Sequence, residues 1–572
     1  MLSASDHLSM KAPHESRLTF NTGSQLNMEL ANQWIATCKK QHARCRFEAK
    51  DTALPTRLIY LTPKNTARLV ISKNLQHVPE YVTLSYCWGG RSSLVLLKSN
   101  LGLFMEEIDV EKVPLTISHA FDIARRMGYS YIWVDSLCII QDSRSDWAEE
   151  APNMGGIYRN AAFTISATSA KHSDEGCFFD RNPLRFTPLL VSGTVDEGIF
   201  IYFATCTYKP SDSVSDWVDD GLWAGRGWVL QERLLSKRNL HFTSEGLVWT
   251  CLENIAFESA PEGQSGSTER HWDLRQLLHP VPATNSSLVP PSPDTLRSEV
   301  LQAPALRIKS LDKANFFNAW TGLTYVYSGC LLTRPTDRLP ALLGLVRELQ
   351  RATGLKIVEG MWIDDYLLPH LLLWRTLHMP NGLFSPPPKR AASFSWASID
   401  SRVHHDKTIK AEILVKNLRV KPAMSNSNEF AQLKIEGKIY DCSFNQISSI
   451  GVSNAVIGGC LLGYTPDTNE VFEPTSQVAL LLILNNKSDG YKADSYTSAA
   501  SITKWANWID RDDIPSTCGL VLVSTTKDNY RRIGQFAVGG LRGSPTSGYD
   551  WDKGFELLRG FETAKEKEIL IV

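Results

Sequence analysis

The pattern that most constrains the fold lies between Tyr81 and about Ile165, where short apolar runs alternate with stretches of helical periodicity. The runs are YVTLSY, YSYIWVD and AAFTISATS. Each has the length and the content of β-branched and aromatic residues that buried strands favour. Strands that alternate with helices usually pair in parallel, so this pattern predicts an α/β unit with a mainly parallel sheet flanked by helices.

The segments between these runs predict two helices. In the first, one helical stripe carries Ile117, Phe121, Ala124 and Met127. Thr116 is the predicted N-cap of this helix, and Gly128 is the predicted residue just past its end. A second helix is predicted over residues 146–160, where Pro152 and two glycines weaken the pattern and could divide the helix.

The chain has 572 residues, which is long enough for two or more domains. Residues 1–77 are a predicted lead-in, with a disordered start, an amphipathic helix from Asn27 to Cys45, and two paired strands, TRLIYL and ARLVI. The α/β unit, with the helix and strands that follow it, covers residues 78–255. A Pro- and Ser-rich stretch over residues 279–299 predicts a linker or an insertion. Residues 311–572 predict an α+β region, helical at first and then rich in strands, without recognisable chemistry.

The charge balance and the apolar runs narrow the classes of partner. Sixty basic residues nearly cancel 61 acidic residues, which leaves no global field for binding nucleic acid or an anionic membrane. The first residues lack the apolar core of a secretory signal, and no run approaches the roughly 20 apolar residues of a membrane span. We therefore expect a cytoplasmic protein that neither spans a membrane nor binds nucleic acid.

The eleven cysteines of this chain are expected to be reduced thiols, because no secretory signal precedes them. Cys38, His42 and Cys45 fall at positions i, i+4 and i+7 of the predicted helix and could supply three zinc ligands. No fourth ligand is spaced in the sequence to complete a site. The favoured interpretation is a helix whose thiols face the core, so no metal site is predicted.

Common enzyme signatures are absent from the sequence: it has no GxxxxGK[ST], no GxGxxG, no HExxH and no GxSxG. It has instead three dense blocks in fixed order, YVTLSYCWGG, YIWVDSLCIIQDSRSDWAEEAPNMGGIYRNA and RGWVLQERLLSKRNLHF. They resemble the hallmark blocks of the fungal heterokaryon incompatibility (HET) domain. The matching residues are Ser85, Tyr86, Trp88, Gly89, Asp135, Ser136, Cys138, Ile139, Gln141, Trp147, Glu150, Met154, Tyr158, Arg226, Trp228, Gln231, Glu232 and Arg233. Pro152 departs from the family pattern.

This resemblance implies a protein of self/non-self recognition and programmed cell death in a fungus, acting through protein partners or self-association. The HET domain in turn resembles TIR domains in its order of elements, which implies a TIR/flavodoxin-like sheet. Several kinds of TIR domain cleave NAD with a single glutamate in a Trp-x-x-x-Glu setting. Trp228 and Glu232 have that spacing, which places both side chains on one face of a helix.

The TIR likeness makes NAD a candidate substrate and Glu232 the candidate catalytic residue, and no cofactor is assigned from the sequence. A carboxylate beneath the ribose can stabilise the oxocarbenium-like state of nicotinamide cleavage or hold the ribose hydroxyls. Ser85 is a candidate contact to phosphate or ribose. Asp135 ends a strand, where open α/β sheets usually bind ligands.

Four further residues are candidate ligand contacts. Trp88 and Trp228 could stack on the nicotinamide or adenine ring. Arg226 or Arg233 could pair with the pyrophosphate, because a guanidinium matches phosphate oxygens in a bidentate way.

Each of these candidates also has a structural interpretation. Tryptophans in short motifs more often anchor packing than stack on a ligand, and Asp135 and Ser136 could cap the element that follows their strand. Glu232 could form a structural ion pair with Arg226 or Arg233. The rival function is therefore a non-enzymatic adaptor that uses the same blocks as a folded core and a recognition surface.

Overall fold

The computed structural model describes residues 20–46, 54–89, 94–181, 189–194, 199–203, 218, 223–265, 274–275, 278–279, 312–376, 390–405, 411–423, 430–449, 452–457, 460–466, 477–485, 517–526, 529–538 and 563–572. The chain divides into two compact units. The first consists of Met1–Leu306, Cys330–Leu332 and Pro340–Ala352. The second consists of Arg307–Gly329, Thr333–Leu339 and Thr353–Val572. The predicted disordered start and the Pro- and Ser-rich stretch lie outside the described residues, apart from His279.

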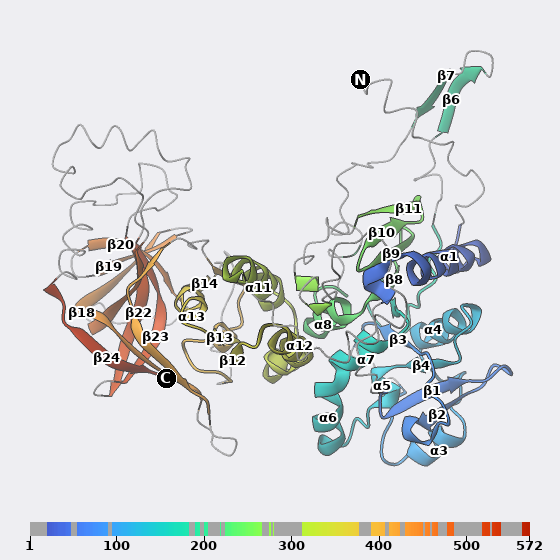
Figure 1. The fold of residues 1–572 in the computed structure, drawn as a ribbon, viewed down its shortest axis with the longest axis horizontal. Coiled ribbons are helices and arrows are strands. Elements are labelled where there is room, and N and C mark those ends of the chain that lie inside the picture. Colours follow the sequence, from blue (N-terminus) through green and yellow to red (C-terminus); the bar gives the residue numbers. More distant parts are fainter. Residues whose placement is uncertain are drawn as a thin grey trace, which may run out of the picture. The chain divides into compact units, whose positions relative to one another are not determined.

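A nine-stranded sheet forms the centre of the first unit (Figure 1). Its strands lie in the order β11-β10-β9-β8-β5-β3-β4-β1-β2. Their bounds are Arg57–Leu61 (β1), Ala67–Ile71 (β2), Val82–Ser85 (β3), Tyr131–Trp133 (β4), Thr164–Ser166 (β5), Arg238–Phe242 (β8), Leu247–Cys251 (β9), Asn254–Phe257 (β10) and Ala260–Ser265 (β11). The hairpin of β6 (Leu189–Thr194) and β7 (Ile199–Phe203) forms a separate two-stranded sheet.

Only the centre of this sheet is parallel. Strand β3 pairs in parallel with β4 and β5, and β5 pairs in parallel with β8. The other five pairings of the sheet are antiparallel. The protein is thus a mixed α/β structure, and the prediction of a mainly parallel sheet is wrong for the sheet as a whole. The antiparallel strands come from the β1–β2 hairpin and from the meander after β8, which short-range alternation does not assign to the sheet.

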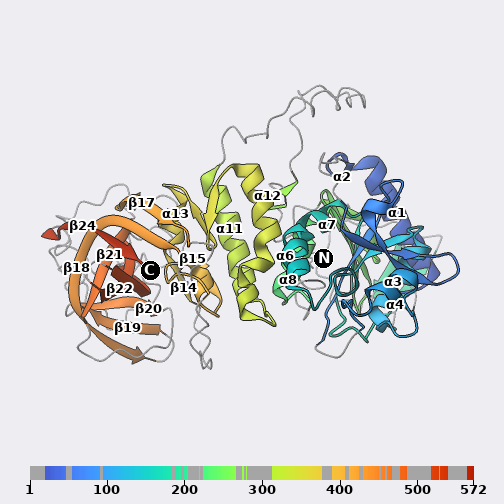
Figure 2. The same cartoon turned by 90° about the horizontal axis from the view of Figure 1, so that it is seen from below.

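Helices cover both faces of the sheet: α1 and α4 lie on one side of it and α6, α7 and α8 on the other (Figures 1 and 2). The helices of this unit are Gln25–Gln41 (α1), Ala43–Arg46 (α2), Leu101–Glu106 (α3), Leu115–Arg126 (α4), Asp135–Cys138 (α5), Arg144–Glu150 (α6), Met154–Asn160 (α7), Gly227–Leu235 (α8) and Leu343–Thr353 (α12). Short 3₁₀ turns lie at Ser72–Asn74 (η1), Ala151–Asn153 (η2) and Pro340–Leu342 (η7). Among the helices in the described part of the chain, none combines the length and the apolar character that crossing a bilayer requires.

Four local predictions about helices can be compared with these bounds. The predicted continuous helix from Asn27 to Cys45 is wrong, because His42 adopts an extended conformation and separates α1 from α2. Thr116 is not the N-cap of α4, which begins one residue earlier; its hydroxyl instead accepts the Gly176 N–H. Gly128 lies just past α4 with a φ of 81°, as predicted. The division of the 146–160 helix is also confirmed, with η2 around Pro152 between α6 and α7.

The second unit begins with α11 (Lys313–Ser328) and becomes rich in strands, as the sequence predicts. Its short elements are Pro335–Arg338 (η6), Lys356–Val358 (β12), Met361–Ile363 (β13), Leu367–Leu371 (α13), Trp374–Thr376 (β14), Trp396–Ser398 (η8) and Val403–His405 (β15). A second nine-stranded sheet consists of Glu412–Ile413 (β16), Lys416–Lys421 (β17), Gln432–Ser449 (β18), Val452–Ile457 (β19), Cys460–Pro466 (β20), Gln477–Asn485 (β21), Thr517–Thr526 (β22), Asn529–Val538 (β23) and Glu566–Ile571 (β24). Because β18 pairs with both β19 and β21, the hydrogen-bonded path returns to β18.

Gln231 connects α8 to the start of α12 within the first unit. Its side-chain oxygen accepts the Gly344 N–H at 2.8 Å and the Leu345 N–H at 3.3 Å. These amides belong to the first turn of α12, where no intrahelical acceptor exists. The start of α12 also lies close to α7, because a Cβ on Gly344 would lie 2.9 Å from the Cα of Gly155. The glutamine of the Gln-Glu-Arg motif therefore secures a helix that is distant in sequence.

We expect Gln231→Ala to lower the free energy of unfolding of the full chain by about 2 kcal/mol, because it leaves two buried amides without an acceptor. Urea unfolding of the parent and the variant measures this difference. Gln25→Ala, at the exposed first position of α1, is the matched control and should change stability little. Equal stability of the parent and Gln231→Ala would show that the contact does not hold α12.

Candidate functional site

The candidate site is centred on the end of β3. The four parallel strands lie in the order β4-β3-β5-β8, so the chain passes from β3 to β4 on one side and then to β5 on the other. The carboxyl ends of strands at such a reversal are where open α/β sheets usually bind ligands. β3 ends with Ser85, whose side chain is buried. The topology of the sheet therefore places a hydroxyl group at the reversal point.

Helix α8 brings Glu232 against this hydroxyl. Ser85 Oγ donates a hydrogen bond to Glu232 Oε2 and accepts one from Trp223 Nε1 at 3.0 Å. The hydroxyl of Tyr158 donates to the Leu84 carbonyl at 3.2 Å and also contacts the Glu232 carboxyl. Glu232 is 5% exposed and Ser85 is 1% exposed, so the contact is shielded from water. A buried carboxyl group and a buried hydroxyl group thus satisfy each other.

Asp135 lies beside this pair at the start of α5. Its Oδ2 accepts the Trp88 indole N–H at 2.9 Å, and its Oδ1 accepts the Ser136 N–H at 2.7 Å. The Ser136 hydroxyl in turn accepts a hydrogen bond from Tyr86 at 2.8 Å. Trp88 and Asp135 are both partly exposed. The group therefore extends from the buried Glu232 towards the surface.

One guanidinium serves both carboxyl groups. Arg226, the residue before α8, donates to the Tyr86 carbonyl, and its positive charge favours the ionised forms of both Asp135 and Glu232. Burial acts in the opposite direction on both acids and is the larger effect. It raises the pKa of Asp135 to about 6. It raises the pKa of Glu232 to about 7, with the neighbouring Asp135 as the second cause.

The structure brings five of the seven predicted site residues into one connected group: Ser85, Trp88, Asp135, Arg226 and Glu232. Trp228 lies one turn before Glu232 on α8 and is partly exposed. Arg233 is buried in the last turn of α8. That any of the seven contacts a ligand stays a prediction, as do the predicted domain boundaries.

Sequence reasoning missed two contributors to this group. Trp223 lies outside the three blocks, and its only signal is an indole shortly before the Arg-Gly-Trp motif. Tyr158 belongs to the second block without a predicted role at the site; it is buried, and its hydroxyl reaches the Glu232 carboxyl. Asp135 is the first residue of α5, whose N-cap is Val134, so it does not cap this helix in the predicted sense; its Oδ1 accepts the N–H of the next residue, Ser136.

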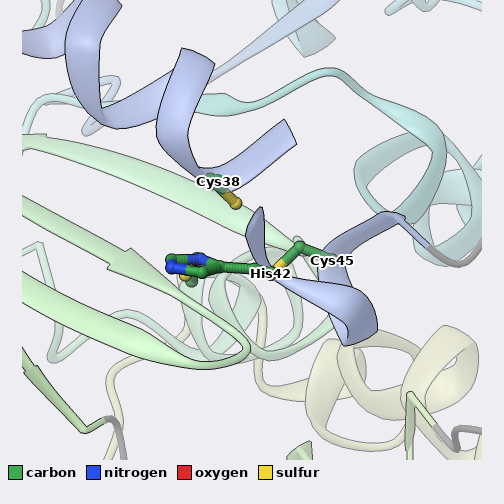
Figure 3. A group of neighbouring side chains, drawn as sticks. Cys38, His42 and Cys45 are labelled. Atoms are coloured by element: carbon green, nitrogen blue, oxygen red, sulfur yellow. The ribbon is translucent and has the colours of Figure 1, made fainter. Parts of the chain in front are cut away.

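A second cluster of chemically active side chains lies where α1 and α2 meet. This junction brings together the side chains of Cys38, His42 and Cys45 (Figure 3), and Cys251 of β9 lies beside them. The sequence-based statement that no fourth ligand completes this set is wrong, because Cys251 lies far along the chain and meets the other three only through the fold. The potential ligand atoms all lie within 4.8 Å of one another.

The comparisons with known proteins concern the segment that contains the candidate site. Residues 81–232 match the family model described as heterokaryon incompatibility protein (HET). The match begins just before β3 and ends at Glu232, so it includes every predicted site residue except Arg233. No curated protein and no solved structure matches the chain.

The raised pKa of Glu232 predicts a pH dependence of stability. Unfolded Glu232 loses its proton near the ordinary pKa of 4.5, whereas the folded protein holds the proton up to about pH 7. Between these values the folded state binds more protons, so the free energy of unfolding falls as pH rises. Glu232→Gln cannot lose a proton, so its stability should fall less between about pH 5 and about pH 8, by up to about 3 kcal/mol.

Urea unfolding at both pH values measures this difference. Asp135, whose pKa is also raised, keeps part of the pH dependence in the variant. Glu149→Gln neutralises an exposed acid of α6 and should follow the parent. If Glu232→Gln loses as much stability as the parent over this range, Glu232 does not retain its proton in the folded protein.

Proposed function

We propose that this chain, whose residues 81–232 form a HET domain, acts in heterokaryon incompatibility, and that it does so by cleaving NAD. The HET domain suggests the first part of this proposal. The second part rests on one observation: a buried carboxyl group, Glu232, held by Ser85 at the reversal point of the parallel strands. Such a carboxyl group has both the position and the pKa for general acid–base or electrostatic catalysis.

The proposed reaction is hydrolysis of the nicotinamide–ribose bond. The carbon–nitrogen bond breaks, and its electron pair leaves with the pyridinium nitrogen, which yields neutral nicotinamide and an oxocarbenium-like ribose. Water adds to the anomeric carbon and releases one proton, so the products are nicotinamide, ADP-ribose and a proton. Glu232 in its ionised form stabilises the positive ribose or holds the ribose hydroxyls. With a pKa of about 7, it is ionised in a large fraction of molecules at neutral pH.

The other candidate residues supply contacts to the rest of the nucleotide. Trp88 and Trp228 are partly exposed indoles, suited to stacking on nicotinamide or adenine. Arg226, also partly exposed, offers a guanidinium to the pyrophosphate; Arg233 is the alternative. Ser85 offers its hydroxyl to ribose or phosphate once its hydrogen bond to Glu232 opens.

The burial of Glu232 fits a domain that is inactive until it is triggered. Only 5% of the surface of Glu232 is exposed, so a substrate reaches its carboxyl group only after the residues that cover it move. Binding of a protein partner or self-association would supply the free energy for that movement, because a ligand shifts a conformational equilibrium by its differential affinity for the two states. In this proposal, self/non-self recognition triggers cell death by opening the site.

A second candidate function is a non-enzymatic adaptor, and two observations favour it. Ser85 and Glu232 satisfy each other's hydrogen bonds, as core residues do. Trp147, on α6, is 39% exposed although it belongs to the family's Asp-Trp pair. An exposed indole on a short helix is typical of the residues that anchor protein interfaces.

Incubation of the purified full chain with NAD, followed by measurement of nicotinamide release, tests the enzymatic proposal. Glu232→Gln and Glu232→Ala should each lower kcat/KM at least about 100-fold, because both remove the charge that stabilises the oxocarbenium-like state. Glu150→Gln is the matched control, since Glu150 is a buried glutamate of the same unit outside the group. A parent that stays inactive when forced to oligomerise, or a Glu232→Gln variant with full turnover, would contradict the assignment.

The adaptor function makes a separate prediction about Trp147. If α6 forms a recognition surface, Trp147→Ala should weaken association between two differently tagged copies of the chain roughly tenfold. Co-precipitation at several protein concentrations measures this change. Leu103→Ala, an exposed apolar residue of α3, is the control for a general loss of apolar surface. Unchanged association of Trp147→Ala would remove this support for the adaptor function.

A further inference from the structure

We propose that Cys38, His42, Cys45 and Cys251 bind one zinc ion in a structural Cys₃His site. Three of the ligands come from the junction of α1 and α2, where His42 and Cys45 follow the end of α1 (Figure 3). The fourth is the last residue of β9. None of the four lies within residues 81–232, so this site is separate from the proposed NAD site and from the segment that matches the HET model.

The distances between the ligand atoms suit a zinc ion. All four atoms lie within 4.8 Å of one another, and His42 Nδ1 is 3.3 Å from Cys251 Sγ. A tetrahedral zinc ion with Zn–S bonds of about 2.3 Å holds its sulfur ligands about 3.8 Å apart. Contraction by about an ångström at most would therefore bring the four atoms into coordination distance.

The chemistry of the set also fits. Three thiolates and one imidazole are a ligand combination of structural zinc sites, and four protein ligands leave no open position for a substrate. The three cysteines are buried and His42 is partly buried. His42 also departs from the helix at this point, with φ −85° and ψ 106°, which separates α1 from α2 between the first and third ligands.

A buried arginine supplies an independent argument for negative charge at the cluster. Arg238, at the start of β8, donates from Nε to Cys38 Sγ at 3.2 Å. Its other described acceptors are the backbone carbonyls of Ala162 and Cys45. A buried guanidinium is costly unless a negative charge lies nearby. Three thiolates with one Zn²⁺ carry a net charge of −1, which balances Arg238.

The backbone around Cys251 supports the same arrangement. The Asn254 N–H donates to Cys251 Sγ at 3.2 Å, the kind of hydrogen bond that outer groups give to metal thiolates. Two further contacts hold the ligand segments together: Trp34 of α1 stacks on Trp249 of β9, and the Arg44 N–H donates to Glu253. The ligands are thus held close together by contacts that do not involve the metal.

Metal analysis of the full-length chain, purified under reducing conditions from zinc-supplemented cells, tests the proposal. We expect about one zinc ion per chain, and Co²⁺ in its place should give the visible absorption of a tetrahedral thiolate site. Cys45→Ser and Cys251→Ser should each reduce bound zinc at least tenfold. Cys177→Ser removes a buried thiol outside the cluster and should leave the zinc content unchanged.

A measurement on the parent chain decides whether the cluster binds zinc even if the cysteine variants do not fold. The chain is stripped with a chelator under reducing conditions and titrated with Zn²⁺ against a chromophoric indicator of micromolar affinity. Uptake of about one equivalent, with restoration of any lost thermal stability, supports the site. A reduced chain that takes no zinc from the indicator, or a thiol count showing a disulfide within the cluster, would overturn it.

Discussion

The parallel pairing of β3 with both β4 and β5 is the constraint on which the candidate site depends. All four residues of β3 are buried, as expected for a strand covered on both faces. Because its neighbours run in the same direction, their carboxyl ends meet at one edge, where Ser85 ends β3 and Asp135 follows β4. Helix α8 then brings the carboxyl group of Glu232 against the Ser85 hydroxyl, which donates a hydrogen bond to it.

The charges at this edge are unequal, because two carboxyl groups lie beside one guanidinium. Asp135 and Glu232 share the positive charge of Arg226, and the charge on Asp135 raises the pKa of Glu232. The two carboxyl groups titrate as a coupled pair, because the negative charge of one makes it harder to ionise the other. The same burial that costs folding free energy at high pH keeps a carboxyl group titrating near neutrality, a combination typical of functional sites.

Short-range patterns predict the local elements well, because periodicity reports which face of an element is buried. Such local patterns predict β3, β4, β5 and α8, and they also predict the division of a helix at Pro152. Pairings between distant segments are invisible to them: β1 and β2 are predicted as a pair, but neither their place in this sheet nor that of the strands after β8 has a local signal. Glu232 is predicted because its spacing to Trp228 resembles the Trp-x-x-x-Glu setting of TIR domains, whereas Trp223 and Cys251 enter their clusters only through the fold.

The thiol cluster and the carboxyl group are linked through the connection between α8 and β8. The Ser236 hydroxyl donates to the Glu232 carbonyl at 2.7 Å and bonds Thr164 of β5 at 2.6 Å, which fixes the end of α8 on the sheet. Two residues later, Arg238 reaches the cluster through Cys38 and Cys45. A metal bound by these thiols would therefore also order the start of β8, and with it the end of the helix that carries Glu232. The residues before the segment that matches the HET model are in this way part of the framework that positions the candidate catalytic residue.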